Sequence, residues 1–258
     1  MKLLAVLWLL LVPLGAAAQP ADGVEVTGLK NPVDKSYRRM VAGVDRFEKR
    51  KDLAPRAALR FKLLPRREST RMEDIDVAIV GDSFETPLEV AADNTFVLPR
   101  DAKGLKENAS VRPNRKAKTM TWRADIRSPG VPAGARRLGD LRLECEVGME
   151  ARLISDYRRS LFGLVRDVFP DGPEYCYREN NQYLFFAERP LWSVTLSHGT
   201  RLEALPVDRL YGAATRDPQW REALPHCDCE VLMDRAYFMP LGDKGWPDDT
   251  LVHFEYMQ

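Results

Sequence analysis

The stretch LRLECEVGM, residues Leu141–Met149, carries the clearest pattern in this chain of 258 residues. Apolar side chains occupy its odd positions, while Arg142, Glu144 and Glu146 occupy even positions between them. A period of two predicts a β-strand with one buried and one solvated face. Cys145 falls on the apolar side, so we expect its sulfur to point into the core.

Shorter runs before this stretch also read as strands. Two of them alternate apolar and polar residues and end at turn residues, Pro65 and Gly81. Proline- and glycine-rich turns, such as residues 128–132, separate the runs. Such a series indicates an antiparallel β-sandwich over residues 59–150. The runs lie at residues 59–64, 75–80, 95–98 and 120–126.

Part of this region resembles a known family. The segments DVAIVG (76–81), TPL (86–88) and ADNTFVLP (92–99) are similar to the opening strands of a carboxypeptidase-regulatory or transthyretin-like β-sandwich. Asn94-Thr95 stands where that family usually has a glycine. With RLGDLRLEC (137–145) and WPDDT (246–250), the chain resembles uncharacterised exported proteins of proteobacteria. The resemblance implies an accessory, binding or stabilising module without catalytic activity.

The first residues have the composition of an export signal. Lys2 precedes an apolar run over residues 3–14, and three alanines, Ala16 to Ala18, precede Gln19. This order predicts a signal peptide at residues 1–18, cleaved near Ala18, and a periplasmic or secreted protein. The apolar run is shorter than the roughly 20 residues that cross a bilayer, and no later run is long enough, so we expect no membrane span.

Residues 19–58 form a basic segment in which an amphipathic helix is expected. Apolar residues recur at helical spacing from Tyr37 to Phe47, with basic residues between them. Thirteen Lys or Arg stand against four acids from Lys35 to Arg71, although the whole chain has a formal charge of only +1. Aromatic residues are not interleaved there as stacking platforms, which argues against nucleic-acid binding. The candidate anion-binding residues are Arg38, Arg39, Arg46, Lys49 and Arg50.

Three interpretations of this basic segment stay open. It is a solvated helix face, or it adheres to anionic polymers of the cell envelope because clustered positive charge concentrates polyanions. Alternatively, it docks against the acidic residues of the chain's own end, residues 222–258.

Residues 151–258 read as an α+β region. An apolar stripe from Ile154 to Val168 predicts a helix, which Ser155 can cap. The segment Ser197-His198-Gly199-Thr200 is typical of a hairpin connection. Strands are expected at residues 184–186, 192–196, 201–205 and 251–256.

Four cysteines in an exported chain predict two structural disulfides. Cys227 and Cys229 are one residue apart, so a direct bridge between them is strained. We therefore expect each to pair with Cys145 or Cys176, in either combination. His226 lies next to Cys227, but the spacing does not match a zinc site, and we predict no metal and no cofactor.

The sequence favours a protein that is not an enzyme. It lacks the motifs of serine hydrolases, zinc proteases and phosphate-binding loops, so no catalytic residue is assigned. The alternative is a cell-wall or glycan hydrolase that uses acids such as Asp248 and Asp249, with His198. Together with Asp243 they are also oxygen donors of the kind that calcium prefers, whereas solvation of a turn explains Asp248 and Asp249 without any site. His253 is expected to be an ordinary histidine, and core positions are expected for Trp192, Trp220 and Trp246 rather than a sugar-stacking platform.

A composition of 45% hydrophobic and 30% charged residues is that of a folded globular chain. The sequence thus predicts a mainly β or α+β protein: an antiparallel β-sandwich followed by a disulfide-stabilised α+β region over residues 151–258. The expected function is non-enzymatic binding or accessory work in the bacterial cell envelope. Its partner is an envelope protein or polymer that the sequence does not identify.

Overall fold

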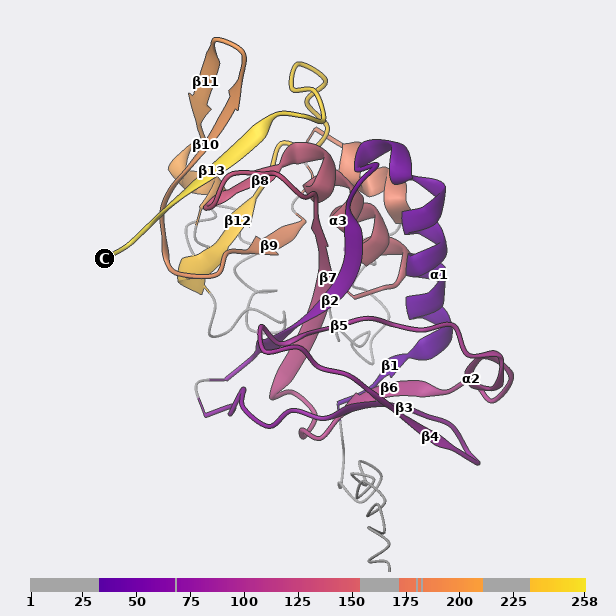
Figure 1. The fold of residues 1–258 in the computed structure, drawn as a ribbon. Helices are drawn as coiled ribbons and strands as arrows, with labels where there is room; N and C mark the ends of the chain where they lie inside the picture. The colour runs from indigo at the N-terminus through magenta and orange to yellow at the C-terminus, as the bar shows by residue number, and fades with distance from the viewer. Residues whose placement is uncertain (1–32, 68, 154–171, 180, 182, 211–232) are drawn as a thin grey trace, which may run out of the picture.

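The computed structural model describes residues 33–67, 69–153, 172–179, 181, 183–210 and 233–258 (Figure 1). More of these described residues lie in strands than in helices, and the paired strands are antiparallel. The predicted signal peptide, the helix expected at residues 154–168, Trp220 and the segment His226–Cys229 lie outside the described residues.

The predicted amphipathic helix is confirmed as α1, Tyr37–Lys49. Ser36 caps it by accepting a hydrogen bond from the Arg39 backbone N–H. The apolar stripe is turned inward, and Tyr37 and Met40 are fully buried. A short 3-10 turn, η1 (Lys51–Leu53), follows directly.

Two antiparallel sheets are formed by residues 35–127, and both contribute side chains to a core that α1 shares. The four strands predicted between residues 59 and 126 are present, with different bounds. The first sheet has the order β5-β2-β7, with β5 Thr95–Phe96, β2 Ala58–Pro65 and β7 Met120–Arg127. The second has the order β1-β6-β3-β4, with β1 Lys35–Ser36, β6 Ser110–Pro113, β3 Val77–Val80 and β4 Glu85–Leu88. The short helix α2, Ala102–Lys106, lies before β6.

Two further sheets come mainly from the C-terminal part. The expected hairpin is confirmed: His198 pairs with Arg201 across a turn in which Gly199 has φ +57°. The larger sheet has the order β11-β10-β13-β8, with β11 Arg201–Ala204, β10 Leu191–His198, β13 Leu251–Tyr256 and β8 Ala135–Arg137. The smaller pairs β12, Ala236–Phe238, with β9, Leu184–Phe186. The 3-10 turns η2 (Gly172–Tyr177), η3 (Val207–Arg209) and η6 (Met233–Arg235) complete the described elements.

The strand prediction for Leu141–Met149 is wrong, because these residues lie in a helix, α3, Leu138–Glu150. Figure 1 shows α3 between α1 and the C-terminal sheets. Leu141, Cys145 and Met149 face the C-terminal core, whereas Leu143 and Val147 pack with α1 and β7. Two helical stripes, each with a spacing of four, together fill every odd position and imitate the period of a strand.

Most even positions of α3 carry charged side chains, and all of these except Glu150 are buried. Arg142, Glu144 and Glu146 are each less than a tenth exposed. The Arg142 guanidinium donates to the backbone oxygens of Leu241, Asp243 and Trp246, each at 2.9 Å. It also binds Asp248 at 2.5 Å. A side chain at Gly148 would overlap the hydroxyl of Tyr183, which explains the glycine there.

The predicted disulfide pairing is also wrong. Cys145 of α3 is bonded to Cys176 of η2, and the bridge closes a separation of 31 residues. Neither cysteine is therefore available to Cys227 or Cys229.

None of the described helices has the length and apolar character needed to cross a membrane.

Candidate functional site

A pocket of about 340 Å³ lies between the β2–β7 ladder and the small β9–β12 sheet. Residues of β8 and α3 contribute to its lining. We call it the inter-sheet pocket. One wall of the pocket is a face of the β2–β7 ladder. Because side chains alternate along a strand, Phe61, Leu63 and Trp122 point into the core on one face. The residues between them, such as Lys62 and Arg123, lie on the other face. Polar residues of this face line the pocket instead of facing open solvent.

A buried ion pair between α3 and β8 forms one part of the lining. Glu144 accepts hydrogen bonds from the Arg136 guanidinium and, at 2.7 Å, from the Ile126 backbone N–H. Arg136 also donates to the Ile126 carbonyl at 2.7 Å. Burial outweighs the attraction of Arg136 and raises the pKa of Glu144 to about 7. Burial lowers the pKa of Arg136 and the Glu144 carboxylate raises it, and the net result is that the pKa of Arg136 lies above its ordinary value.

The remaining carboxylates of the lining share one arginine at the exposed side. Arg127 binds Asp125 at 2.8 Å and Glu188 at 3.2 Å. The three acids of the lining, Glu144 included, are therefore held by two arginines. Three more basic residues stand beside them, so the lining has five basic groups against three carboxylates.

Those three basic residues donate to backbone carbonyls. Lys62 bonds the Asp93 carbonyl, Arg123 bonds that of Leu153, and Arg235 bonds that of Glu188 at 2.9 Å. The Arg123 guanidinium also lies 5.9 Å from the centre of the Phe186 ring.

Aromatic and aliphatic side chains complete the pocket. Tyr183 and Tyr237 are buried, and burial raises the pKa of both hydroxyls above its ordinary value, so they stay neutral. Phe186, Leu64 and Met72 are only partly buried and supply apolar surface. The pocket thus combines an apolar wall with converging cationic groups, as ligand sites commonly do.

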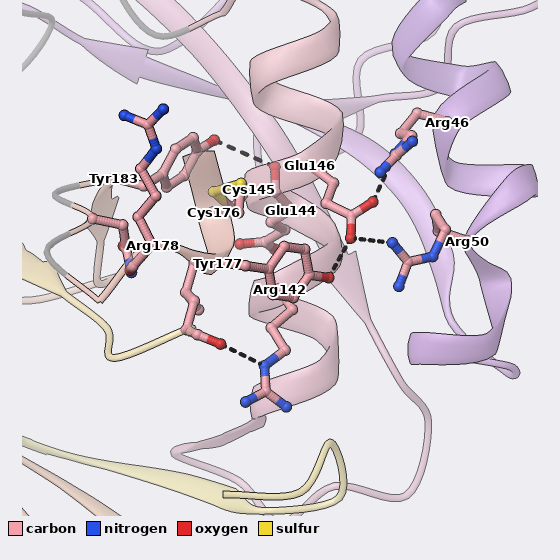
Figure 2. Close-up of a disulfide and its surroundings, with 12 residues drawn as sticks. Arg46, Arg50, Arg142, Glu144, Cys145, Glu146, Cys176, Tyr177, Arg178 and Tyr183 are labelled. Atoms are coloured by element: carbon pink, nitrogen blue, oxygen red, sulfur yellow. Dashed lines mark hydrogen bonds and ion pairs between the residues drawn. A yellow bond between two sulfur atoms is a disulfide. The ribbon is translucent and has the colours of Figure 1, made fainter. Parts of the chain in front are cut away.

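The predicted anion-binding residues of α1 do not form one free surface. Arg46 and Arg50 turn toward α3 and bind Glu146, each at 2.6 Å (Figure 2). The hydroxyl of Tyr177, next to the disulfide, donates to the same carboxylate. We call these four residues the Glu146 cluster. Burial, and then the bond to Glu146, raise the pKa of Tyr177 above its ordinary value.

The other three candidates on α1 lie apart from this cluster. Arg38 donates to the Leu105 carbonyl at 2.5 Å and to Asn108 at 2.9 Å. Arg39 and Lys49 are exposed. One interpretation of the basic segment is that it docks against the acidic residues 222–258. Arg46 and Arg50 do not do so, because their carboxylate partner is Glu146 of α3.

The two acids of the hydrolase alternative, Asp248 and Asp249, have different partners. Asp248 is bound by Arg142, whereas Asp249 lies 3.3 Å from the Nε2 of His198. The carboxylate of Asp243 accepts the Gly245 backbone N–H at 2.7 Å. His253 Nε2 lies 2.8 Å from the hydroxyl oxygen of Ser197.

The tryptophans differ from one another. Trp246 is buried, as expected of a core residue, and Arg201 lies 3.6 Å from its ring centre. The core prediction for Trp192 is wrong, because its side chain is 68% exposed. Among the described residues, no group of three or more His, Cys, Asp or Glu is arranged to hold a metal ion.

Comparison with known proteins gives no relative: no protein-family model, curated protein or solved structure matches this chain.

Sequence reasoning did not find the inter-sheet pocket. The polar positions of β2 and β7 were visible as alternation, and the natural interpretation was a face in contact with solvent. Arg136 and Glu144 carried no separate signal, because the second half of the chain buries them.

Proposed function

We propose that this chain is an exported, non-enzymatic binding or accessory protein of the bacterial cell envelope, and that it holds a small ligand in the inter-sheet pocket. The observation that carries the proposal is the lining, in which five basic groups meet apolar and aromatic side chains around a space of about 340 Å³. This volume lies at the lower end of the range of known ligand sites, about 300–1,000 Å³.

Export is supported by two independent features. The first 18 residues have the composition of a signal peptide. The Cys145–Cys176 disulfide is typical of proteins in oxidising compartments.

We further propose that the two sheets of residues 35–127 form the carboxypeptidase-regulatory or transthyretin-like β-sandwich that the sequence resembles. The shared core between antiparallel sheets supports this assignment. The sandwich ends before α3, since the stretch expected to be its last strand is helical.

The two alternatives have weaker support. A hydrolase that relies on Asp248 would have to release it from Arg142, which holds it at 2.5 Å. Adhesion to anionic polymers through α1 would depend on Arg39 and Lys49, since Arg46 and Arg50 are bound to Glu146.

The test is binding of small aromatic fragments to the exported full chain. Indole, benzyl alcohol and benzamide are neutral probes whose contact with the protein ligand-observed NMR detects. We expect saturable binding that Leu64→Trp abolishes, because the larger ring fills the pocket. The matched control is Leu202→Trp on the exposed strand β11, where the side chain is 71% exposed. The proposal would be overturned if neither substitution changed the binding of the fragments, or if no fragment bound at all.

A further inference from the structure

The pocket lining contains buried N–H groups that find no acceptor within the part of the chain that the structure describes. The Nε atoms of Arg136 and Arg235 are inaccessible to solvent and have no hydrogen-bond partner among the described residues. The nearest carboxylate oxygen to the Arg235 Nε, that of Asp234, is 4.0 Å away, beyond hydrogen-bond distance. An unsatisfied buried donor costs about 1–3 kcal/mol, so an acceptor that enters the pocket is favoured at these positions.

The charge balance specifies the kind of acceptor. Arg127 and Arg136 already hold the three carboxylates of the lining, while Lys62 and Arg235 bond backbone carbonyls. The excess of basic groups favours an anion over a neutral ligand. A single carboxylate carries two acceptor oxygens, one for each of the two Nε donors of Arg136 and Arg235.

The apolar wall specifies the rest of the ligand. Leu64, Met72 and Phe186 are partly exposed on the pocket side, and covering them with an apolar body is favourable. A space of about 340 Å³ suits one or two fused rings rather than a chain of several units.

Building on the proposed binding function, we propose that the inter-sheet pocket takes a small organic acid, with a compact aromatic body against the apolar wall and a single carboxylate received by Arg235 and Arg136. Each guanidinium would donate its Nε–H, and hydrogen bonds between a guanidinium and a carboxylate are among the stronger ones in proteins.

The experiment compares two probes that differ in charge and little in shape. Indole-3-acetate and indole-3-acetamide are titrated into the exported full chain by isothermal calorimetry. The acetate is expected to bind at least about tenfold more tightly, as a charge-assisted hydrogen bond implies. Arg235→Gln should reduce acetate affinity about tenfold and leave acetamide affinity within about twofold.

Arg39→Gln is the matched control, since it removes the same charge from the exposed face of α1. Its effect on acetate binding is expected to be less than about twofold, because Arg39 does not line the pocket and salt screens exposed charges. A control effect equal to that of Arg235→Gln would show general electrostatics and overturn the inference.

The remaining outcomes separate this inference from the proposed function. If acetate and acetamide bind equally, and Leu64→Trp still blocks both, the carboxylate preference is wrong while the binding function stands. If neither binds and the neutral fragments also fail, both proposals fall. Inorganic phosphate at tenfold excess should not displace the acetate; displacement would mean a general anion site and would overturn the requirement for an aromatic body.

Discussion

Two buried carboxylates, two residues apart on α3, have opposite surroundings. Glu146 accepts from Arg46, Arg50 and Tyr177, so its cluster joins α1, α3 and η2 (Figure 2). Glu144 has one arginine and one backbone N–H, and it lines a pocket in which donors remain unused. The difference separates a satisfied structural cluster from a pocket lining in which the Nε atoms of Arg136 and Arg235 have no partner among the described residues.

Glu146→Ala is expected to have the largest effect on stability. It leaves Arg46 and Arg50 without their shared anion, and the loss of one partner from a buried ion pair costs about 3–5 kcal/mol. Urea unfolding followed by circular dichroism measures this loss. A cost below about 1 kcal/mol would mean that the Glu146 cluster is not what holds α1 to α3.

Replacing both Cys145 and Cys176 by alanine should cost nearly as much. A bridge across 31 residues stabilises by about 3–4 kcal/mol when it restricts the unfolded chain. The same unfolding assay, with the intact mass measured to confirm the substitutions, gives the loss. Unchanged stability would show that η2 stays docked through its other contacts, such as the buried Tyr175 and the Tyr177 hydrogen bond.

Glu144→Gln tests the pocket side of the comparison through pH. The folded pKa of about 7 exceeds the ordinary value of 4.5, so the stability linked to Glu144 is fully present below about pH 4.5. It is lost as pH rises through about 7. The variant should lack this decline, a difference on the order of 3 kcal/mol between pH 4.5 and 7.5. Parallel stability profiles for the two proteins would contradict the prediction.

The smallest effects come from two tyrosines. Tyr177→Phe removes a hydrogen bond to the Glu146 carboxylate and should cost about 1.5–3 kcal/mol. Tyr183→Phe removes a longer bond, 3.4 Å, to the Glu144 backbone carbonyl and should cost less than about 1 kcal/mol. Thermal unfolding of the two variants shows which loses more stability. A larger loss for Tyr183→Phe than for Tyr177→Phe would contradict the contrast between the Glu146 cluster and the surroundings of Glu144.

Local pattern predicted those elements whose two faces differ. The stripe of α1 and the alternation of β2, β7, β10 and β13 each reflect a buried face opposite a polar one. α3 has no such contrast, because every residue from Leu138 to Met149 is buried. Its charged residues therefore resemble a solvated face, although Arg142, Glu144 and Glu146 are each bound by residues outside α3.

The candidate site was beyond local reasoning for the same reason. Lys62 and Arg123 are paired across β2 and β7, but the opposite wall comes from residues about 60 or more positions later, including Phe185 and Tyr237. The disulfide partner of Cys145 depends on the same distant packing. Such contacts follow from the tertiary structure and leave no periodic trace in the sequence.

The Arg142 side chain also sets a condition on the order of folding. Its four acceptors belong to residues 241–248, about 100 positions later in the chain. During synthesis, which starts at the N-terminus, α3 is complete long before residues 241–248 are made. Until then the Arg142 guanidinium lacks these four hydrogen-bond acceptors. Contacts of such long range make folding slow. A truncation before residue 241 would thus be expected to damage the centre of the molecule, not only its edge.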